Sequence, residues 1–63
     1  AIDGLVAILG DPKASLEARV AAMKGLGVLE AAEELPRIIR ALAADEPALQ
    51  DAARTAIARI EGE

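Results

Sequence analysis

The second half of this 63-residue chain repeats the first half. Residues 18–29 align with residues 49–60 at an offset of 31 positions, and residues 2–9 align with residues 35–42 at an offset of 33 positions. A period in the low thirties is typical of proteins built from helix pairs, in which each pair buries its apolar face against its neighbours. The sequence therefore predicts a single helical domain over residues 1–63, with a first unit at about 1–29 and a second at about 31–60.

The composition favours helices throughout the chain. Its apolar residues are aliphatic side chains and alanine, with one methionine and no aromatic residue. Strong helix formers predominate, and strand formers are few. We expect an all-α fold of four helices in two antiparallel pairs, with a closed four-helix bundle as the alternative. Because a chain this short buries a thin core and has no Cys or His, association with more protein is the remaining source of added stability.

Apolar residues at helical spacing place the four helices at about 2–10, 16–29, 31–44 and 46–60. A Gly-Asp-Pro turn at 10–12 ends the first helix, and Ser15 is suited to cap the second. Pro36 is tolerated only in a first turn, so the third helix either begins near Glu34 or is kinked there. We expect Asp45 to cap the fourth helix.

The second helix differs from the fourth on one side. Both carry an apolar arc, but where the fourth helix has Asp51, Arg54 and Ala58 the second helix has a further apolar face. The residues of that face are Leu16, Val20, Met23 and Gly27. Gly25 and Gly27 weaken a helix, and close approach of another backbone would offset this cost. Either the second apolar face binds a partner, or a compact bundle places this helix at its centre.

Both units share a recurring set of motifs. In the second unit they are residues 35–42, a turn that contains Asp45 and Pro47, and residues 52–60. In the first unit they are residues 10–12, 17–19 and 25–29. Together they resemble a HEAT-like helical repeat of the short bacterial type, which implies stacked helix pairs that act as a scaffold for protein partners. The resemblance also implies a polar ladder between repeats, for which Asp11 and Arg19 match the usual pair. In the second unit Asp45 matches, but Gln50 replaces the arginine.

Side chains suited to catalysis are scarce. The chain lacks His, Cys and Tyr and has one Ser and one Thr; Ser15 is better explained as a helix cap, and Thr55 has no evident partner. Glu30, Glu33 and Glu34 carry oxygen ligands for a hard cation, but acidic residues at a helix start more often interact with the helix dipole. We therefore expect no enzyme, with no catalytic residue, no cofactor and no metal site.

The charge and hydropathy patterns exclude two classes of partner. A net charge of −4 argues against nucleic acid, whose binding requires clustered Lys and Arg. No apolar run reaches the ~20 residues that span a bilayer, and no signal-peptide pattern is present. We expect a cytoplasmic protein that contacts neither nucleic acid nor membrane.

Two functions fit these observations. The first is a non-catalytic interaction or scaffold module that associates with itself, as a homo-oligomer, or with another helical protein through Leu16, Val20, Met23 and Gly27. Since Trp and Tyr are absent, such a contact would be aliphatic. The alternative is an engineered or excised minimal helical-repeat fragment with a purely structural role.

Overall fold

The computed structural model describes residues 2–62, and this part of the chain is helical without any strand. The helices are α1 (Ile2–Leu9), α2 (Leu16–Val28), α3 (Leu35–Ala41) and α4 (Pro47–Glu61), with a 3-10 turn, η1 (Ala32–Glu34), directly before α3. The all-α fold with four helices that the sequence predicted is therefore confirmed.

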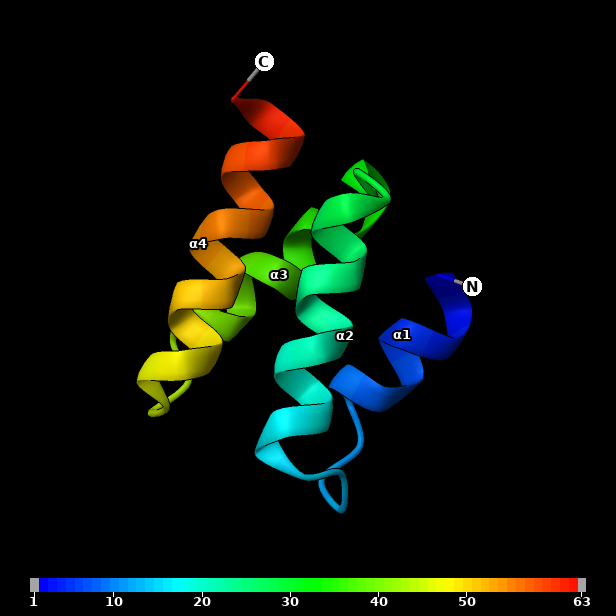
Figure 1. The fold of residues 1–63 in the computed structure, drawn as a ribbon, viewed down its shortest axis with the longest axis vertical. Coiled ribbons are helices and arrows are strands. Elements are labelled where there is room, and N and C mark those ends of the chain that lie inside the picture. Colours follow the sequence, from blue (N-terminus) through cyan, green and yellow to red (C-terminus); the bar gives the residue numbers. More distant parts are fainter. Residues whose placement is uncertain (1, 63) are drawn as a thin grey trace.

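The helices pack as two pairs, α1 with α2 and α3 with α4, and the two pairs meet through α2 and α4. α2 and α4 lie side by side and run in the same direction, from the lower to the upper end of Figure 1. α1 packs against α2 and α3 against α4, each running opposite to its partner. This arrangement places α2 between α1 and α4, so two of its sides face other helices.

Two of the three predicted helix starts agree with the structure. The Ser15 side-chain oxygen accepts a hydrogen bond from the backbone N–H of Ala18 at 3.0 Å, which confirms the cap of α2. α3 begins at Leu35 with Pro36 in its first turn, where a missing N–H requires no partner, so the helix starts there and is not kinked. The predicted range of 31–44 is too long, because Ala32–Glu34 form the 3-10 turn and α3 ends at Ala41.

The predicted cap of α4 is wrong. The N-cap residue is Glu46 and not Asp45, and the Glu46 side chain makes no capping hydrogen bond. Pro47 occupies the first turn of α4, and its fixed backbone angle supports helix initiation without a side-chain cap.

The end of α2 has the hydrogen bonds of a Schellman motif. The backbone N–H of Glu30 donates to the carbonyl of Gly27 at 3.0 Å, and that of Ala31 donates to the carbonyl of Leu26 at 3.1 Å. Glu30 has a φ of 50°, in the left-handed region that usually takes glycine at this position. This turn directs the chain into the second unit with Ala31 buried.

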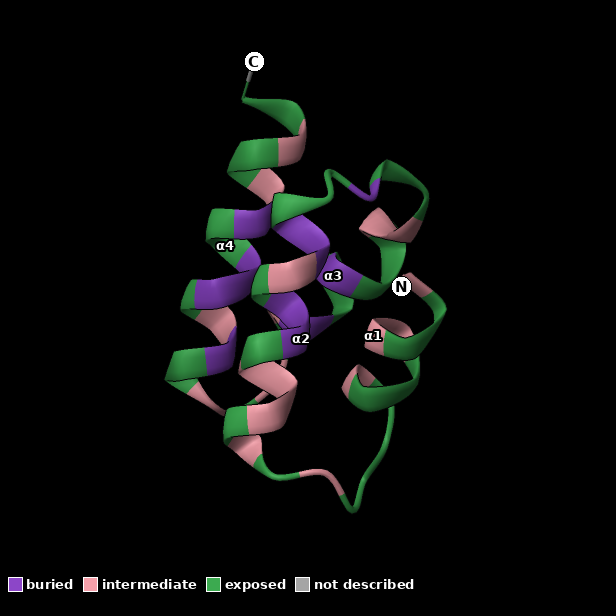
Figure 2. Ribbon diagram, turned by 45° about the vertical axis from the view of Figure 1, so that its right-hand side comes forward, coloured by how far each residue is buried: buried purple, intermediate pink, exposed green. Residues whose placement is uncertain are grey.

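The core is built mainly from α2 and α4 and is rich in alanine (Figure 2). Its buried apolar residues are Ala22, Met23, Leu26, Ala31, Ile38, Ala41, Leu49, Ala52, Ala53 and Ala56. Small side chains allow neighbouring helices to approach closely. α1 contributes no buried residue, although all its side chains except Asp3 are apolar or absent.

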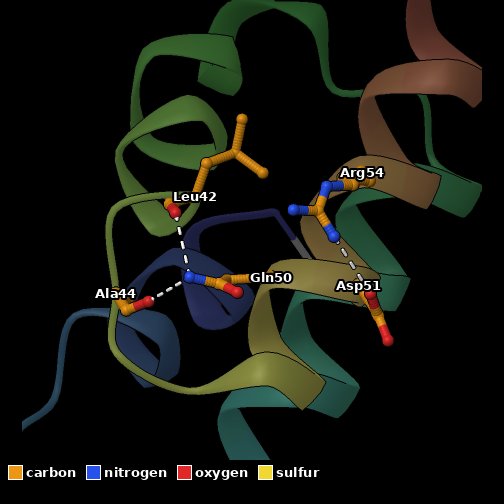
Figure 3. A network of polar contacts seen from close by, with 5 residues as sticks. All are labelled: Leu42, Ala44, Gln50, Asp51 and Arg54. Atoms are coloured by element: carbon orange, nitrogen blue, oxygen red, sulfur yellow. Dashed lines mark hydrogen bonds and ion pairs between the residues drawn. The ribbon is translucent and has the colours of Figure 1, made fainter.

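Equivalent positions of the two units carry polar side chains with different partners, Gln50 within the second unit and Arg19 between the units. The Gln50 amide donates to the carbonyls of Leu42 at 3.2 Å and Ala44 at 2.5 Å, and so satisfies two acceptors at the end of α3 (Figure 3). Its counterpart Arg19 lies 3.4 Å from the Glu46 carboxylate. Arg19 therefore bridges the first unit to the second.

The polar ladder implied by the family resemblance is not formed by the expected residues. The Asp11 carboxylate accepts a hydrogen bond from the backbone N–H of Lys13 at 2.8 Å, within its own turn. The partner of Arg19 is Glu46, the residue that precedes the first turn of α4. An ion pair between units is present, but a glutamate supplies its negative charge.

Candidate interaction surface

The four residues predicted to form a second apolar face of α2 are divided between the core and the surface. Met23 has no exposed surface, and Gly27 is also buried. Leu16 and Val20 are half-buried. A single accessible face made by all four residues is not present, because α4 packs over part of it. This supports the interpretation that the fold places α2 at its centre.

The closest approach between α2 and α4 occurs at Gly27. A Cβ atom at Gly27 would lie 2.9 Å from the Cα of Ala56 and 3.0 Å from its Cβ, which is closer than real Cβ atoms come. The backbone approach expected at Gly27 is therefore confirmed. Gly25 differs, because a Cβ there would meet the flexible end of the Leu5 side chain at 3.0 Å, and its three nearest atoms all belong to that side chain.

A surface groove of about 490 Å³ lies between α2 and α4. Its apolar lining consists of Val20, Gly27, Val28, Ala48, Ala52 and Ala56, and its polar lining consists of Lys24, Asp51, Thr55 and Arg59. Val28 is 63 % exposed, the largest exposed fraction among the large apolar side chains of the described residues. The groove thus combines an accessible apolar surface with polar side chains from both helices.

A second hollow of about 290 Å³ continues this groove toward the start of α2. The two share Val20, Lys24 and Ala48, and the second adds Leu16. From Leu16 to Val28 the groove follows α2 for about 18 Å, since a helix rises 1.5 Å per residue. Two of the predicted interaction residues, Leu16 and Val20, therefore lie along one continuous surface that also includes α4.

The charges around the groove are of two kinds. The Asp51 carboxylate accepts a hydrogen bond from the Arg54 guanidinium at 3.2 Å, so its charge is already paired (Figure 3). Lys24 on α2 and Arg59 on α4 are exposed and form no ion pair with any residue between 2 and 62. Unpaired positive charge therefore borders the apolar lining on both sides.

A smaller hollow of about 200 Å³ separates α1 from α3. Val6 and Leu9 line it from α1, and Arg37 and Arg40 line it from α3. The Arg37 guanidinium donates to the Glu34 carboxylate at 2.9 Å, and both arginines are exposed. This hollow shows that α1 and α3 are not closely packed, and it is a weaker candidate surface than the groove.

The described residues offer little other chemistry. Between residues 2 and 62 no group of three or more acidic, His or Cys side chains lies together in a way that suits a metal ion, and this includes Glu30, Glu33 and Glu34. None of the helices in this part of the chain has the length and apolar character required to cross a bilayer.

Comparisons of the chain with protein-family models, curated proteins and solved structures found no match. The resemblance to HEAT-like repeats therefore stays a prediction, and any functional proposal must come from the geometry of the chain itself.

The sequence interpretation missed the contribution of α4 to the candidate surface. The signal was present in Ala48, Ala52 and Ala56, which recur every four residues and so share one face of a helix. Small residues at this spacing permit close packing of a neighbouring helix, and α2 packs here through Gly27, which lies against Ala56. Thr55 and Arg59 then lie beside this small-residue face.

Proposed function

We propose that the chain is a non-catalytic interaction module that binds a helical segment of a partner protein in the groove between α2 and α4. The observation that carries this proposal is the groove itself, about 18 Å long and lined by apolar side chains, with Val28 largely exposed. A third helix packs naturally between two adjacent parallel helices, because interhelical distances of about 8–10 Å leave a furrow that matches its side chains. Recognition of an amphipathic helix in an apolar groove is a common binding mode.

A different protein is a better occupant than a second copy of the chain. The most apolar exposed helix is α1, where Ile8 is 39 % exposed, and it lies on the other side of α2 from α4. If α1 of one copy entered the groove of another, the two contacting surfaces would be different. Such a heterologous contact does not close unless the copies form a ring, and otherwise it grows into filaments. Self-association of α1 with the groove therefore predicts large, concentration-dependent particles, whereas two copies packed groove against groove would stop at a dimer.

Titration of the ¹⁵N-labelled protein with amphipathic peptides tests the proposal. Three stapled helices of about 14 residues, long enough to span the groove at 1.5 Å per residue, share one leucine stripe and carry Glu, Gln or Lys on both flanks. We expect at least one peptide to shift the amide signals of Val20, Val28 and Thr55. Absence of binding by all three peptides, or shifts confined to α1 and α3, would contradict the proposal.

A pair of tryptophan variants provides the matched control. Thr55→Trp places an indole over the groove, whereas Ala58→Trp adds the same side chain to an exposed position of α4 that does not line it. We expect Thr55→Trp to weaken peptide binding by about tenfold or more, which is ~1.4 kcal/mol, and Ala58→Trp to change it by less than about twofold. Equal losses in the two variants would show that the groove is not the binding site.

Sedimentation equilibrium separates partner binding from self-association. A monomer across the concentration range agrees with the proposal, and particles that grow with concentration and disappear in Thr55→Trp would instead identify a second copy as the occupant. The alternative of a purely structural fragment predicts a monomer that binds none of the peptides.

A further inference from the structure

The positive charges at the groove have no partner within the described chain. Between residues 2 and 62 the ion pairs are Arg19 with Glu46, Arg37 with Glu34, and Arg54 with Asp51. Lys24 and Arg59 are absent from all of these, although the chain has more acidic than basic residues. Both side chains line the groove.

The placement of Arg59 links its charge to the apolar lining. A Cβ at Gly27 would lie 3.7 Å from the Arg59 Cδ atom, so the aliphatic part of this side chain extends over the crossing of α2 and α4. Arginine and lysine commonly pack their methylene groups on apolar surface and keep the charge in water. The Arg59 guanidinium is therefore held at the edge of the groove, where a bound segment would meet it.

The two charges have a defined spacing along the groove. Gly27 lies opposite Ala56; Lys24 comes three residues before Gly27 on one wall, and Arg59 comes three residues after Ala56 on the other. Because α2 and α4 run in the same direction, these positions are about 9 Å apart along the groove axis (Figure 1). A bound helix would therefore meet one positively charged residue on each flank.

The acidic groups near the groove do not cancel this pattern. Asp51 is paired with Arg54, and Glu17 lines the second hollow together with Lys24, seven residues before it and about 10 Å away along α2. The remaining acidic side chains lie outside the lining of the groove. At physiological ionic strength exposed charges are screened beyond about 8–10 Å, so a bound segment responds to Lys24 and Arg59 more than to the net charge of −4.

We propose that the partner segment is an acidic amphipathic helix, with an apolar stripe that packs against the groove and carboxylates on both flanks that pair with Lys24 and Arg59. This inference rests on the proposed function, because it specifies which helix the same groove selects. Charge complementarity of this kind adds specificity and accelerates association more than it adds affinity. Selection between peptides of opposite charge is accordingly the property to measure.

A double charge reversal tests the inference. Lys24→Glu combined with Arg59→Glu changes the net charge of the chain from −4 to −8. The matched control, Lys13→Glu combined with Arg40→Glu, makes the same change with one lysine and one arginine that are exposed, unpaired within residues 2–62 and outside the groove. Far-UV circular dichroism of both variants first establishes that they are folded.

The readout is the ratio of affinities for the Glu-flanked and Lys-flanked peptides, measured by fluorescence anisotropy. In the parent we expect the Glu peptide to bind about tenfold more tightly, and the groove variant to reverse this order. In the control variant the ratio should stay within about twofold of the parent, because its new charges lie outside the groove. Added salt should weaken binding of the Glu peptide and leave the Gln peptide unchanged.

The outcomes distinguish this inference from the proposed function. If the Gln or Lys peptide binds the groove as tightly as the Glu peptide, the groove is a binding site and the acidic partner is wrong. If the control variant lowers the ratio as much as the groove variant does, net charge and not Lys24 with Arg59 determines the selection. Absence of binding by all three peptides contradicts both proposals together.

Discussion

Replacement of Gly27 by alanine tests the packing on which both the fold and the groove depend. The added Cβ would lie 2.9 Å from the Cα of Ala56, a backbone atom that cannot move unless α4 moves. Alanine favours a helix over glycine by about 0.8–1 kcal/mol, so propensity alone predicts a more stable protein. Overpacking of a close contact costs about 1–3 kcal/mol and opposes that gain.

Gly25→Ala is a control within the same helix. It adds the same methyl group two residues away, and the nearest atom is the end of the Leu5 side chain at 3.0 Å, which can change its rotamer. We expect Gly25→Ala to stabilise the protein by roughly 0.5–1 kcal/mol. Since helix propensity contributes equally to both variants, the difference between them isolates the packing cost, about 1–3 kcal/mol in favour of Gly25→Ala.

Urea and thermal unfolding followed by far-UV circular dichroism measure this difference. Circular dichroism is required because the chain has no tryptophan or tyrosine for intrinsic fluorescence. A domain of this size is stable by about 3–9 kcal/mol, so a difference of 1 kcal/mol is readily measured and corresponds to about 4–8 °C in Tm. If Gly27→Ala is as stable as Gly25→Ala, α2 and α4 do not approach as closely as described, and the argument for the groove fails with it.

Four further variants probe the core and the turns that follow α2 and α3. Met23→Glu should abolish the helical circular dichroism signal because it buries an unpaired charge, whereas Val20→Glu, at a half-buried position, should retain it. Gln50→Leu should lower the free energy of unfolding by about 1–3 kcal/mol, as judged by urea titration, because two carbonyls lose their donor. Glu30→Gly should raise the urea midpoint by the equivalent of about 1 kcal/mol, because glycine accepts the left-handed backbone of this residue without strain; an unchanged midpoint would contradict this explanation.

Local sequence signals predicted the helices well, because each depends on a few neighbouring residues. Ser15 caps α2 and Pro36 lies in the first turn of α3 in the structure, as hydrogen bonding and proline geometry require. The prediction that Asp45 caps α4 was wrong for an equally local reason. Two acidic residues precede Pro47, and the sequence does not show which of them takes the N-cap position when neither side chain makes a capping bond.

The candidate site was harder to predict because it depends on which helix lies beside which face. The second apolar face of α2 follows directly from the repeat comparison, but its exposure depends on where α4 packs. Met23 and Gly27 are covered by the second unit of the same chain, and Leu16 and Val20 remain at the edge. A helical periodicity identifies an apolar face without identifying the element that covers it.

The mismatch between the two units now has a physical explanation. In the first unit, Met23 and Gly27 are apolar because the second unit packs on them, and Val20 borders the groove that this packing creates. No further helix pair packs on the equivalent side of α4 within the described residues, where Asp51 and Arg54 are exposed and paired with each other. The residues that distinguish the units thus reflect whether another helix packs on them, and the proposed binding function is better sought in the groove between the units than on either unit alone.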